Sequence, residues 1–227
     1  AATLLVPGGR TPAPFLEHLA CTELDWPRIT VGLTDERWVP VEDPASNERL
    51  LRTHLLRDAA ALARLQGLWN EAPDVARGAQ RAWKNLETLR RPFDAVVLGM
   101  GEDGHFASLF PDDEASRAGL DIGTEPACIA VSAPVAPVQR ISLNLAALLQ
   151  ARELFLLVTG ERKWALLEQQ LDPAPSPGLP VHALLAQRRH VAHPRRPRRL
   201  QRSRRQGRQL RPTHRSPSPT PTTGDGW

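Results

Sequence analysis

The chain of 227 residues is poor in cysteine and methionine: Cys21 and Cys128 are its only cysteines and Met100 is its only methionine. Two cysteines are too few for a disulfide framework, and their spacing is not that of metal ligands, so we expect a reducing compartment and no metal site. No apolar run approaches the length of about 18 residues that a membrane span needs, and the amino end lacks the basic-then-apolar layout of a signal peptide. We therefore expect a cytoplasmic protein without a membrane partner. Because the chain opens at Ala1 on a strand pattern, we also expect a segment to precede it.

Acidic residues are nearly missing from residues 188–227, where Asp225 is the only one. This stretch holds 12 basic residues and has a net charge of +11, whereas residues 1–187 hold 17 basic and 24 acidic residues and have a net charge of −7. The stretch is rich in Arg, Pro, Ser and Thr and has no periodic apolar face, so it cannot bury enough surface to offset the entropy of ordering. We expect one folded domain over 1–187 and a disordered or aberrant tail over 188–227.

Four short apolar runs set the expected fold class. They are ATLLV (2–6), RITVGL (28–33), FDAVVLGM (93–100) and ELFLLVTG (153–160). Each run ends in polar or glycine-rich residues and most are followed by a helical pattern, which is the order of β-α units. The sequence therefore predicts a three-layer α/β fold with a mostly parallel sheet flanked by helices. Ligands of such sheets bind at the carboxyl ends of the strands, which is where the polar loops lie.

Helical patterns follow three of these runs, and another covers residues 73–90. We expect Thr11 to cap the first helix, with Pro12 at its first position, and Ser46 to cap the second. The apolar faces of the three helices are Phe15, Leu16 and Leu19; Leu50, Leu51, Leu55 and Leu56; and Trp164, Leu167 and Leu171. Alternating apolar residues predict a further strand over 140–145.

The stretch VLGMGEDGH (97–105) has the G-x-G-x-x-G spacing of a dinucleotide-binding turn. A pyrophosphate would have to approach Glu102 and Asp103, which disfavours that interpretation, and a tight turn without chemistry is a second alternative. We favour a third, in which the glycines bend the chain so that Asp103 and His105 face one small substrate. A carboxylate beside an imidazole fixes the tautomer and makes a general base near neutral pH.

Two other loops supply candidate ligand contacts. TDERW places Asp35, Glu36 and Arg37 at the end of the second run, where a solvated loop with a local ion pair is the alternative interpretation. PGGRTP offers backbone N–H groups at the start of a helix, which is a favourable anion site. Positive charge from Arg140 and Lys163 would strengthen such a site, and Lys163 is one of only two lysines in 1–187.

Together these motifs resemble the 6-phosphogluconolactonases. VPGGRTP, TDERWVPVEDPASNERL, FDAVVLGMGEDGHFASLFP, QRISLNL and LVTGERKWALL occur in the order and spacing of that family, from about residue 4 to residue 185. The resemblance implies a fold related to the glucosamine-6-phosphate deaminases. It also implies hydrolysis of 6-phospho-D-glucono-1,5-lactone to 6-phosphogluconate in the oxidative pentose phosphate pathway, without a metal or organic cofactor.

The resemblance further implies a role for each matching residue. His105 would activate water against the lactone carbonyl, and Asp103 would orient His105. Asp35 and Arg37 would line the carbonyl and hydroxyl side of the substrate, with Arg37 stabilising the developing oxyanion. Asn47 would be a secondary substrate contact. The implied ligands of the 6-phosphate are Gly8, Gly9, Arg10, Thr11, Arg140 and Lys163.

The chain also departs from the family pattern. Pro7 stands where the family often has Ser, which removes a hydroxyl and an N–H from the phosphate loop, and Phe106 replaces a small or Thr residue beside the base. We expect the domain over 1–187 to lack the helix that usually precedes the first strand in that family. After LPVHALL the chain enters the tail instead of a closing strand and helix, so we expect an uncovered sheet edge.

The two alternatives are a related enzyme and a non-catalytic protein that binds a sugar phosphate or a nucleic acid. A glucosamine-6-phosphate deaminase shares the phosphate loop, but that group typically carries Asn-Glu-Pro after the histidine, where this chain has FASLFP (106–111). The tail with its charge of +11 could serve as a nucleic-acid arm. Because no aromatic residues are interleaved with its arginines and residues 1–187 are acidic, we expect no nucleic-acid partner. We expect a monomer that binds a small phosphorylated sugar lactone.

Overall fold

The computed structural model describes residues 1–9, 11–171 and 178–187, all within the compact unit formed by 1–194. The expected phosphate ligand Arg10 and the expected tail over 188–227 lie outside the described residues.

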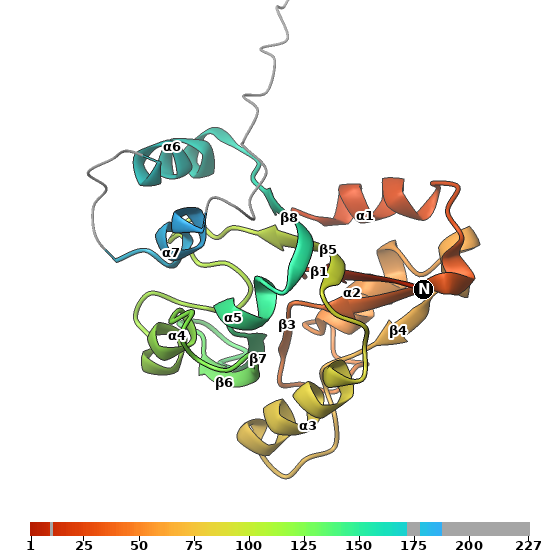
Figure 1. The fold of residues 1–227 in the computed structure, drawn as a ribbon, viewed down its shortest axis with the longest axis horizontal. Helices are drawn as coiled ribbons and strands as arrows, with labels where there is room; N and C mark the ends of the chain where they lie inside the picture. Colours follow the sequence, from red (N-terminus) through yellow and green to blue (C-terminus); the bar gives the residue numbers. More distant parts are fainter. Residues whose placement is uncertain (10, 172–177, 188–227) are drawn as a thin grey trace, which may run out of the picture. The chain divides into compact units, whose positions relative to one another are not determined.

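A five-stranded parallel sheet forms the centre of this unit (Figure 1). In sheet order its strands are β4 (Arg64–Gln66), β2 (Ile29–Leu33), β1 (Ala2–Val6), β5 (Phe93–Gly99) and β8 (Ala151–Leu157). The four apolar runs are β1, β2, β5 and β8, so the predicted α/β fold with a mostly parallel sheet flanked by helices is confirmed. Within the described part of the chain β8 pairs only with β5, so β8 is an edge strand.

A separate antiparallel sheet was not predicted. Its strands, in sheet order, are β3 (Asp35–Arg37), β7 (Gln139–Leu143) and β6 (Cys128–Ser132). The strand expected over 140–145 ends at Leu143, because Asn144 caps the short helix α5 (Leu145–Leu148) and its side chain accepts the N–H of Ala147 at 2.9 Å. Leu145 is the first buried residue of that helix, and it lies two residues after Leu143, so it fits the alternation of the strand without belonging to it.

The helices expected in the sequence are all present, and further short ones were not predicted. The helices are α1 (Ala13–Ala20), α2 (Asn47–His54), α3 (Val75–Glu87), α4 (Glu114–Gly119), α5, α6 (Glu161–Gln170) and α7 (Pro180–Ala186), with 3-10 turns η1 (Trp26–Arg28) and η2 (Asp58–Leu62). Ser46 caps α2 as predicted, since its side chain accepts the N–H of Arg49 at 3.2 Å. The prediction that Thr11 caps α1 is wrong. Pro12 occupies the cap, and its carbonyl accepts the first helical N–H, from Leu16 at 2.9 Å.

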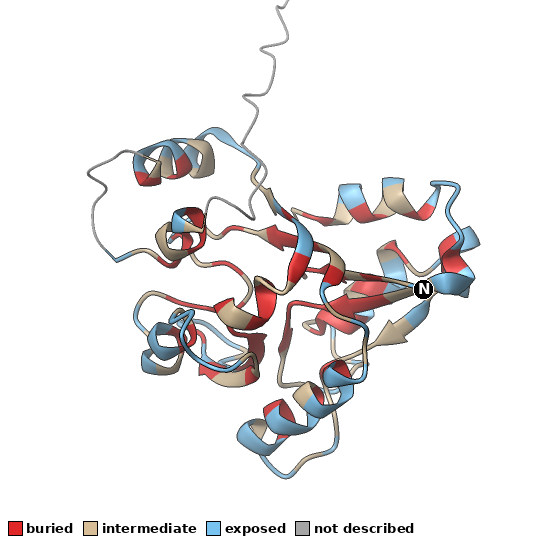
Figure 2. Ribbon diagram, in the orientation of Figure 1, coloured by how far each residue is buried: buried red, intermediate tan, exposed pale blue. Residues whose placement is uncertain are grey.

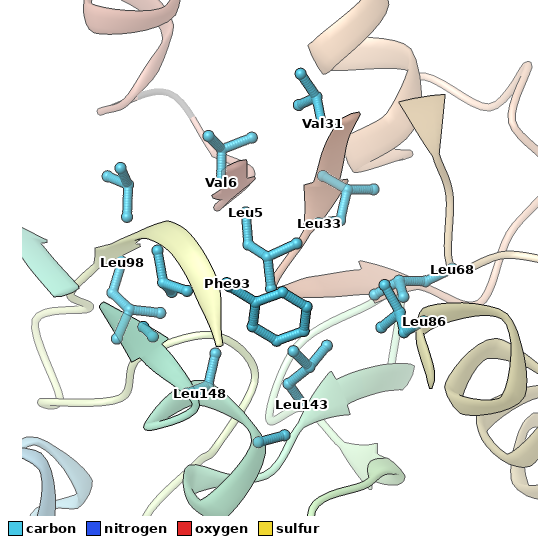
Figure 3. Close-up of a cluster of buried hydrophobic side chains, with 14 of the residues drawn as sticks. Leu5, Val6, Val31, Leu33, Leu68, Leu86, Phe93, Leu98, Leu143 and Leu148 are labelled. Atoms are coloured by element: carbon cyan, nitrogen blue, oxygen red, sulfur yellow. The ribbon is translucent and has the colours of Figure 1, made fainter. Parts of the chain in front are cut away.

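The main core joins the two sheets and α3. Phe93 of β5 is fully buried and lies between Leu5 of β1 and Leu143 of β7, with Leu86 of α3 nearby (Figure 3). Buried residues concentrate on the strands and on the inner sides of the helices (Figure 2). The antiparallel sheet is therefore held against the parallel sheet by apolar packing, which fixes where β3 and β7 present their polar residues.

A smaller apolar cluster holds the segment that follows β5. Met100 packs with Leu167 of α6 and with Val181 and Leu185 of α7. The N–H of Val181 also donates to the carbonyl of Gly104 at 3.0 Å. Helices α6 and α7, which lie next to each other in Figure 1, thus support the loop that carries Asp103 and His105.

Candidate active site

A cavity of about 260 Å³ lies at the carboxyl ends of β1 and β5 and beside β3. Parallel sheets bind their ligands at this end. Nine of the expected site residues line the cavity: Gly8, Gly9, Thr11, Asp35, Arg37, Asn47, His105, Arg140 and Lys163. Asp103 is not in the wall but bonds to His105, which is. Segments that are up to about 150 residues apart in the sequence therefore contribute to one small space.

His105 and Asp103 form a close pair. The distance between His105 Nδ1 and Asp103 Oδ1 is 2.6 Å, and the backbone N–H of His105 donates to the same oxygen at 3.2 Å. Burial alone would raise the pKa of Asp103, but the hydrogen bonds from His105 and its positive charge outweigh burial and lower that pKa. An ionised carboxylate at Nδ1 requires a proton on that nitrogen, so in the neutral ring Nε2 is the basic atom.

The glycines of this loop have different reasons to be there. A Cβ on Gly101 would lie 2.2 Å from His105 Nδ1 and 2.5 Å from Asp103 Oδ1, so the pair occupies the space of a side chain. Gly104 has a φ of +77°, which other residues rarely adopt. The next helix, α4, begins only at Glu114, whereas the dinucleotide motif opens directly into a helix. The loop therefore has the geometry that the acid–imidazole interpretation requires and lacks that of a nucleotide turn.

Strands β3 and β7 place two arginines in opposite register positions. Arg37 is the register partner of Arg140, and both line the cavity. Like charges in directly opposite positions destabilise a sheet, and the charges of Asp35 and Glu36 oppose this effect at Arg140. Burial, and next the charge of Arg37, lower the pKa of Arg140. With Lys163, from the first turn of α6, they give the cavity three cationic side chains.

Phe110 contacts both the imidazole of His105 and the guanidinium of Arg140. Its ring centroid is 4.6 Å from that of His105, and the Arg140 guanidinium lies 5.4 Å from the Phe110 centroid. The ring thus packs against the imidazole and also makes a cation–π contact.

Gly8 and Gly9 follow β1 and face Asn47 at the start of α2. Gly9 has a φ of +95°, as expected of a glycine turn. Gly8 is required for space instead, because a Cβ there would lie 1.8 Å from Asn47 Oδ1. The amide of Asn47 is oriented by its bond from Nδ2 to the carbonyl of Asp35, at 2.9 Å. Among the described residues nothing bonds to Asn47 Oδ1 or to Arg37 Nε, although both atoms are buried.

Glu36, the middle residue of the DER triplet in TDERW, has a structural role in the site that its place in the motif did not predict. It is 1% exposed, and its carboxylate accepts backbone N–H groups from Arg37, Asn47 and Glu48, each at 2.7 Å, and the Ser46 hydroxyl at 3.1 Å. Burial raises the pKa of Glu36 to about 7 against the opposing effect of these N–H donors. The alternation of a strand was the available signal: if Asp35 and Arg37 face the cavity, the residue between them faces inward.

Two other features, a metal site and a membrane span, are not found among the described residues. There, no group of three or more His, Cys, Asp or Glu side chains is placed to hold a metal ion. No helix in the same part of the chain is both long and apolar enough to span a bilayer.

Known proteins resemble this chain both in sequence and in structure. Residues 1–193 match the family of "Glucosamine-6-phosphate isomerases/6-phosphogluconolactonase". The chain belongs to this family. It is 45% identical over 184 residues to the 6-phosphogluconolactonase of Pseudomonas putida, a match that covers 81% of this chain and 76% of the relative. A 6-phosphogluconolactonase structure from Shewanella baltica OS155 superposes with a TM-score of 0.78 at 40% identity, covering 84% of this chain and 81% of that one.

The fold is also similar to that of a deaminase. A monomeric glucosamine-6-phosphate deaminase of the NagB superfamily superposes with a TM-score of 0.67 over 84% of this chain and 83% of that one, at 19% identity. The fold related to the deaminases is therefore confirmed.

The close packing at Gly101 leads to a prediction for stability. Gly101→Ala would overpack the His105–Asp103 pair and should lower the free energy of unfolding by about 1–3 kcal/mol. Gly99→Ala is the matched control, because the nearest atom to a Cβ there is Pro7 Cγ at 4.0 Å. Urea denaturation of both variants measures the difference. Equal losses in the two would show that the space beside Gly101 is not restricted.

The raised pKa of Glu36 leads to a prediction for pH dependence. Because the folded-state pKa of about 7 exceeds the ordinary value of 4.5, protonation favours folding, and this contribution is lost as the pH rises from 4.5 through 7. The full loss is about 3 kcal/mol, from about 1.4 kcal/mol per pH unit. Glu36→Gln should lack this loss, so its free energy of unfolding should fall less than that of the unmodified chain between pH 5 and 8. Parallel pH curves from urea denaturation would contradict the assignment.

Proposed function

We propose that this chain hydrolyses 6-phospho-D-glucono-1,5-lactone to 6-phosphogluconate. The observation that carries the proposal is one cavity that holds both an imidazole paired with a carboxylate and three cationic side chains. The first arrangement suits activation of water, and the second suits a phosphate. The relatives named 6-phosphogluconolactonase, 45% identical in the case of Pseudomonas putida, support the same substrate.

In the proposed reaction His105 is the general base. Asp103 keeps the proton on Nδ1, so Nε2 removes a proton from the water that attacks the lactone carbonyl carbon. The new bond joins the water oxygen to that carbon, and the carbonyl oxygen becomes an oxyanion that Arg37 stabilises. When the intermediate collapses, the bond between this carbon and the ring oxygen breaks, and the imidazolium returns its proton to the ring oxygen. Asp35 contacts the carbonyl and hydroxyl side of the sugar.

The phosphate of the substrate binds in the same cavity. Backbone N–H groups at Gly8 and Gly9, the start of α1 near Thr11, and the cations Arg140 and Lys163 hold it. Arg10 belongs to the same proposed set, although it lies outside the described residues. Asn47 makes a secondary contact to the sugar. An anion at this place also relieves the repulsion between the paired arginines.

The proposal extends to the setting of the reaction. The partner is a small phosphorylated sugar lactone, and the step belongs to the oxidative pentose phosphate pathway in the cytoplasm. The lactonase domain is 1–187, and the active form is a monomer.

The test compares lactone hydrolysis by the unmodified chain and its variants, with the spontaneous rate subtracted. His105→Ala should lower kcat by about 10²- to 10⁴-fold, the usual contribution of a general base. Asp103→Asn should also lower kcat, since it favours the wrong tautomer. His54→Ala is the matched control, because His54 makes a similar contact with a carboxylate, Glu17, at 2.8 Å but does not line the cavity. Equal rates for the unmodified chain and His105→Ala would remove His105 from the mechanism.

A further inference from the structure

The carboxylate of Asp35 is held on both oxygens by hydroxyl groups. Thr34 Oγ1 donates to Asp35 Oδ1 at 3.2 Å, and Ser108 Oγ donates to Asp35 Oδ2 at 2.6 Å. Asp35 is 5% exposed, and both hydroxyl residues are fully buried. Asp35 lines the cavity, whereas neither Thr34 nor Ser108 does. The orientation of Asp35, which lines the cavity, is therefore set by two residues that do not line it.

Ser108 also connects three parts of the site. It lies three residues after His105, in the loop that continues from the glycine turn. Its backbone N–H donates to Ser142 Oγ at 3.1 Å, and the Ser142 hydroxyl donates in turn to the carbonyl of Leu143 at 3.1 Å. Ser142 is the register partner of Asp35 in the antiparallel sheet. One residue thus bonds the histidine loop to β7 through its backbone and to β3 through its side chain.

The backbone just before Ser108 needs such support. Ala107 has a φ of +48°, a left-handed conformation that costs free energy for a residue with a side chain. Ala107, which lies between His105 and Ser108 in the sequence, lines the cavity. Residues in this conformation persist where the surrounding structure holds them, and the two hydrogen bonds of Ser108 provide that restraint.

We infer that Ser108 is a positioning residue for the reaction: it orients the Asp35 carboxylate and fixes the histidine loop relative to it. Ser108 does not touch the substrate and acts through Asp35 and the loop. The expected effect of Ser108 on turnover rests on the proposed function. The expected effect of Ser108 on the histidine loop does not depend on that function.

The matched variants are Ser108→Ala and Thr3→Val. Thr3 is also buried, at 6% exposure, and its hydroxyl lies 3.4 Å from a carboxylate oxygen, that of Asp94, but it does not line the cavity. Each variant removes one buried hydroxyl that contacts a carboxylate, so a general loss of stability should be similar in both. Thermal unfolding measures that loss.

Steady-state lactone hydrolysis then separates positioning from stability. Ser108→Ala should lower kcat by about 10- to 100-fold with KM changed less than about threefold, because small displacements of reacting groups are costly while the phosphate contacts stay intact. Thr3→Val should leave both constants within about twofold. A kcat for Ser108→Ala that matches Thr3→Val, or a change confined to KM, would overturn the inference.

Hydrogen–deuterium exchange tests the same inference without turnover. Amides of residues 100–109 should exchange faster in Ser108→Ala and at the unmodified rate in Thr3→Val. Unchanged exchange in Ser108→Ala would overturn the positioning role. If the unmodified chain hydrolyses the lactone no faster than the spontaneous reaction, the proposed function fails, and the exchange result still decides the role of Ser108.

Discussion

The contact between His105 Nδ1 and Asp103 Oδ1, formed against the Cα of Gly101, is the interaction on which the site depends. At 2.6 Å it stabilises an ionised carboxylate and leaves Nε2 as the basic nitrogen of the neutral ring. The contact exists because Gly101 has no side chain and because Gly104 accepts a left-handed turn. Met100 and the Val181–Gly104 hydrogen bond then attach this turn to α6 and α7.

The antiparallel sheet supplies the second half of the site by simple alternation. Asp35 and Arg37 point from β3 into the cavity, while Glu36 between them points inward and accepts the N–H groups at the start of α2. One short strand therefore gives an acid and a cation to the cavity and ties them to the helix that carries Asn47. The pairing of Arg37 with Arg140 concentrates positive charge where the proposed phosphate binds.

Much of this could be predicted from local sequence, and some could not. The apolar runs predicted β1, β2, β5 and β8. The polar loops after them predicted that Asp35 and His105 lie together, because strand ends in a parallel sheet meet on one side, whereas Asn47 was expected only from the family resemblance. The pairing of β3 with β7 joins residues that are about 100 positions apart, and no local pattern encodes such a register. For the same reason the burial of Ser108 followed only from the tertiary structure, whereas the inward position of Glu36 could have been predicted from strand alternation. The role of Arg10 as a phosphate ligand and the disordered or aberrant tail over 188–227 stay predictions.

The tautomer of His105 decides whether Nε2 is free to act as the base. Nitrogen-15 NMR of the imidazole, at a pH where the ring is neutral, distinguishes a proton on Nδ1 from one on Nε2. The account predicts the Nδ1–H form in the unmodified chain and a loss of that preference in Asp103→Asn. An Nε2–H form in the unmodified chain would contradict it, because the nitrogen assigned to remove a proton from water would already carry one.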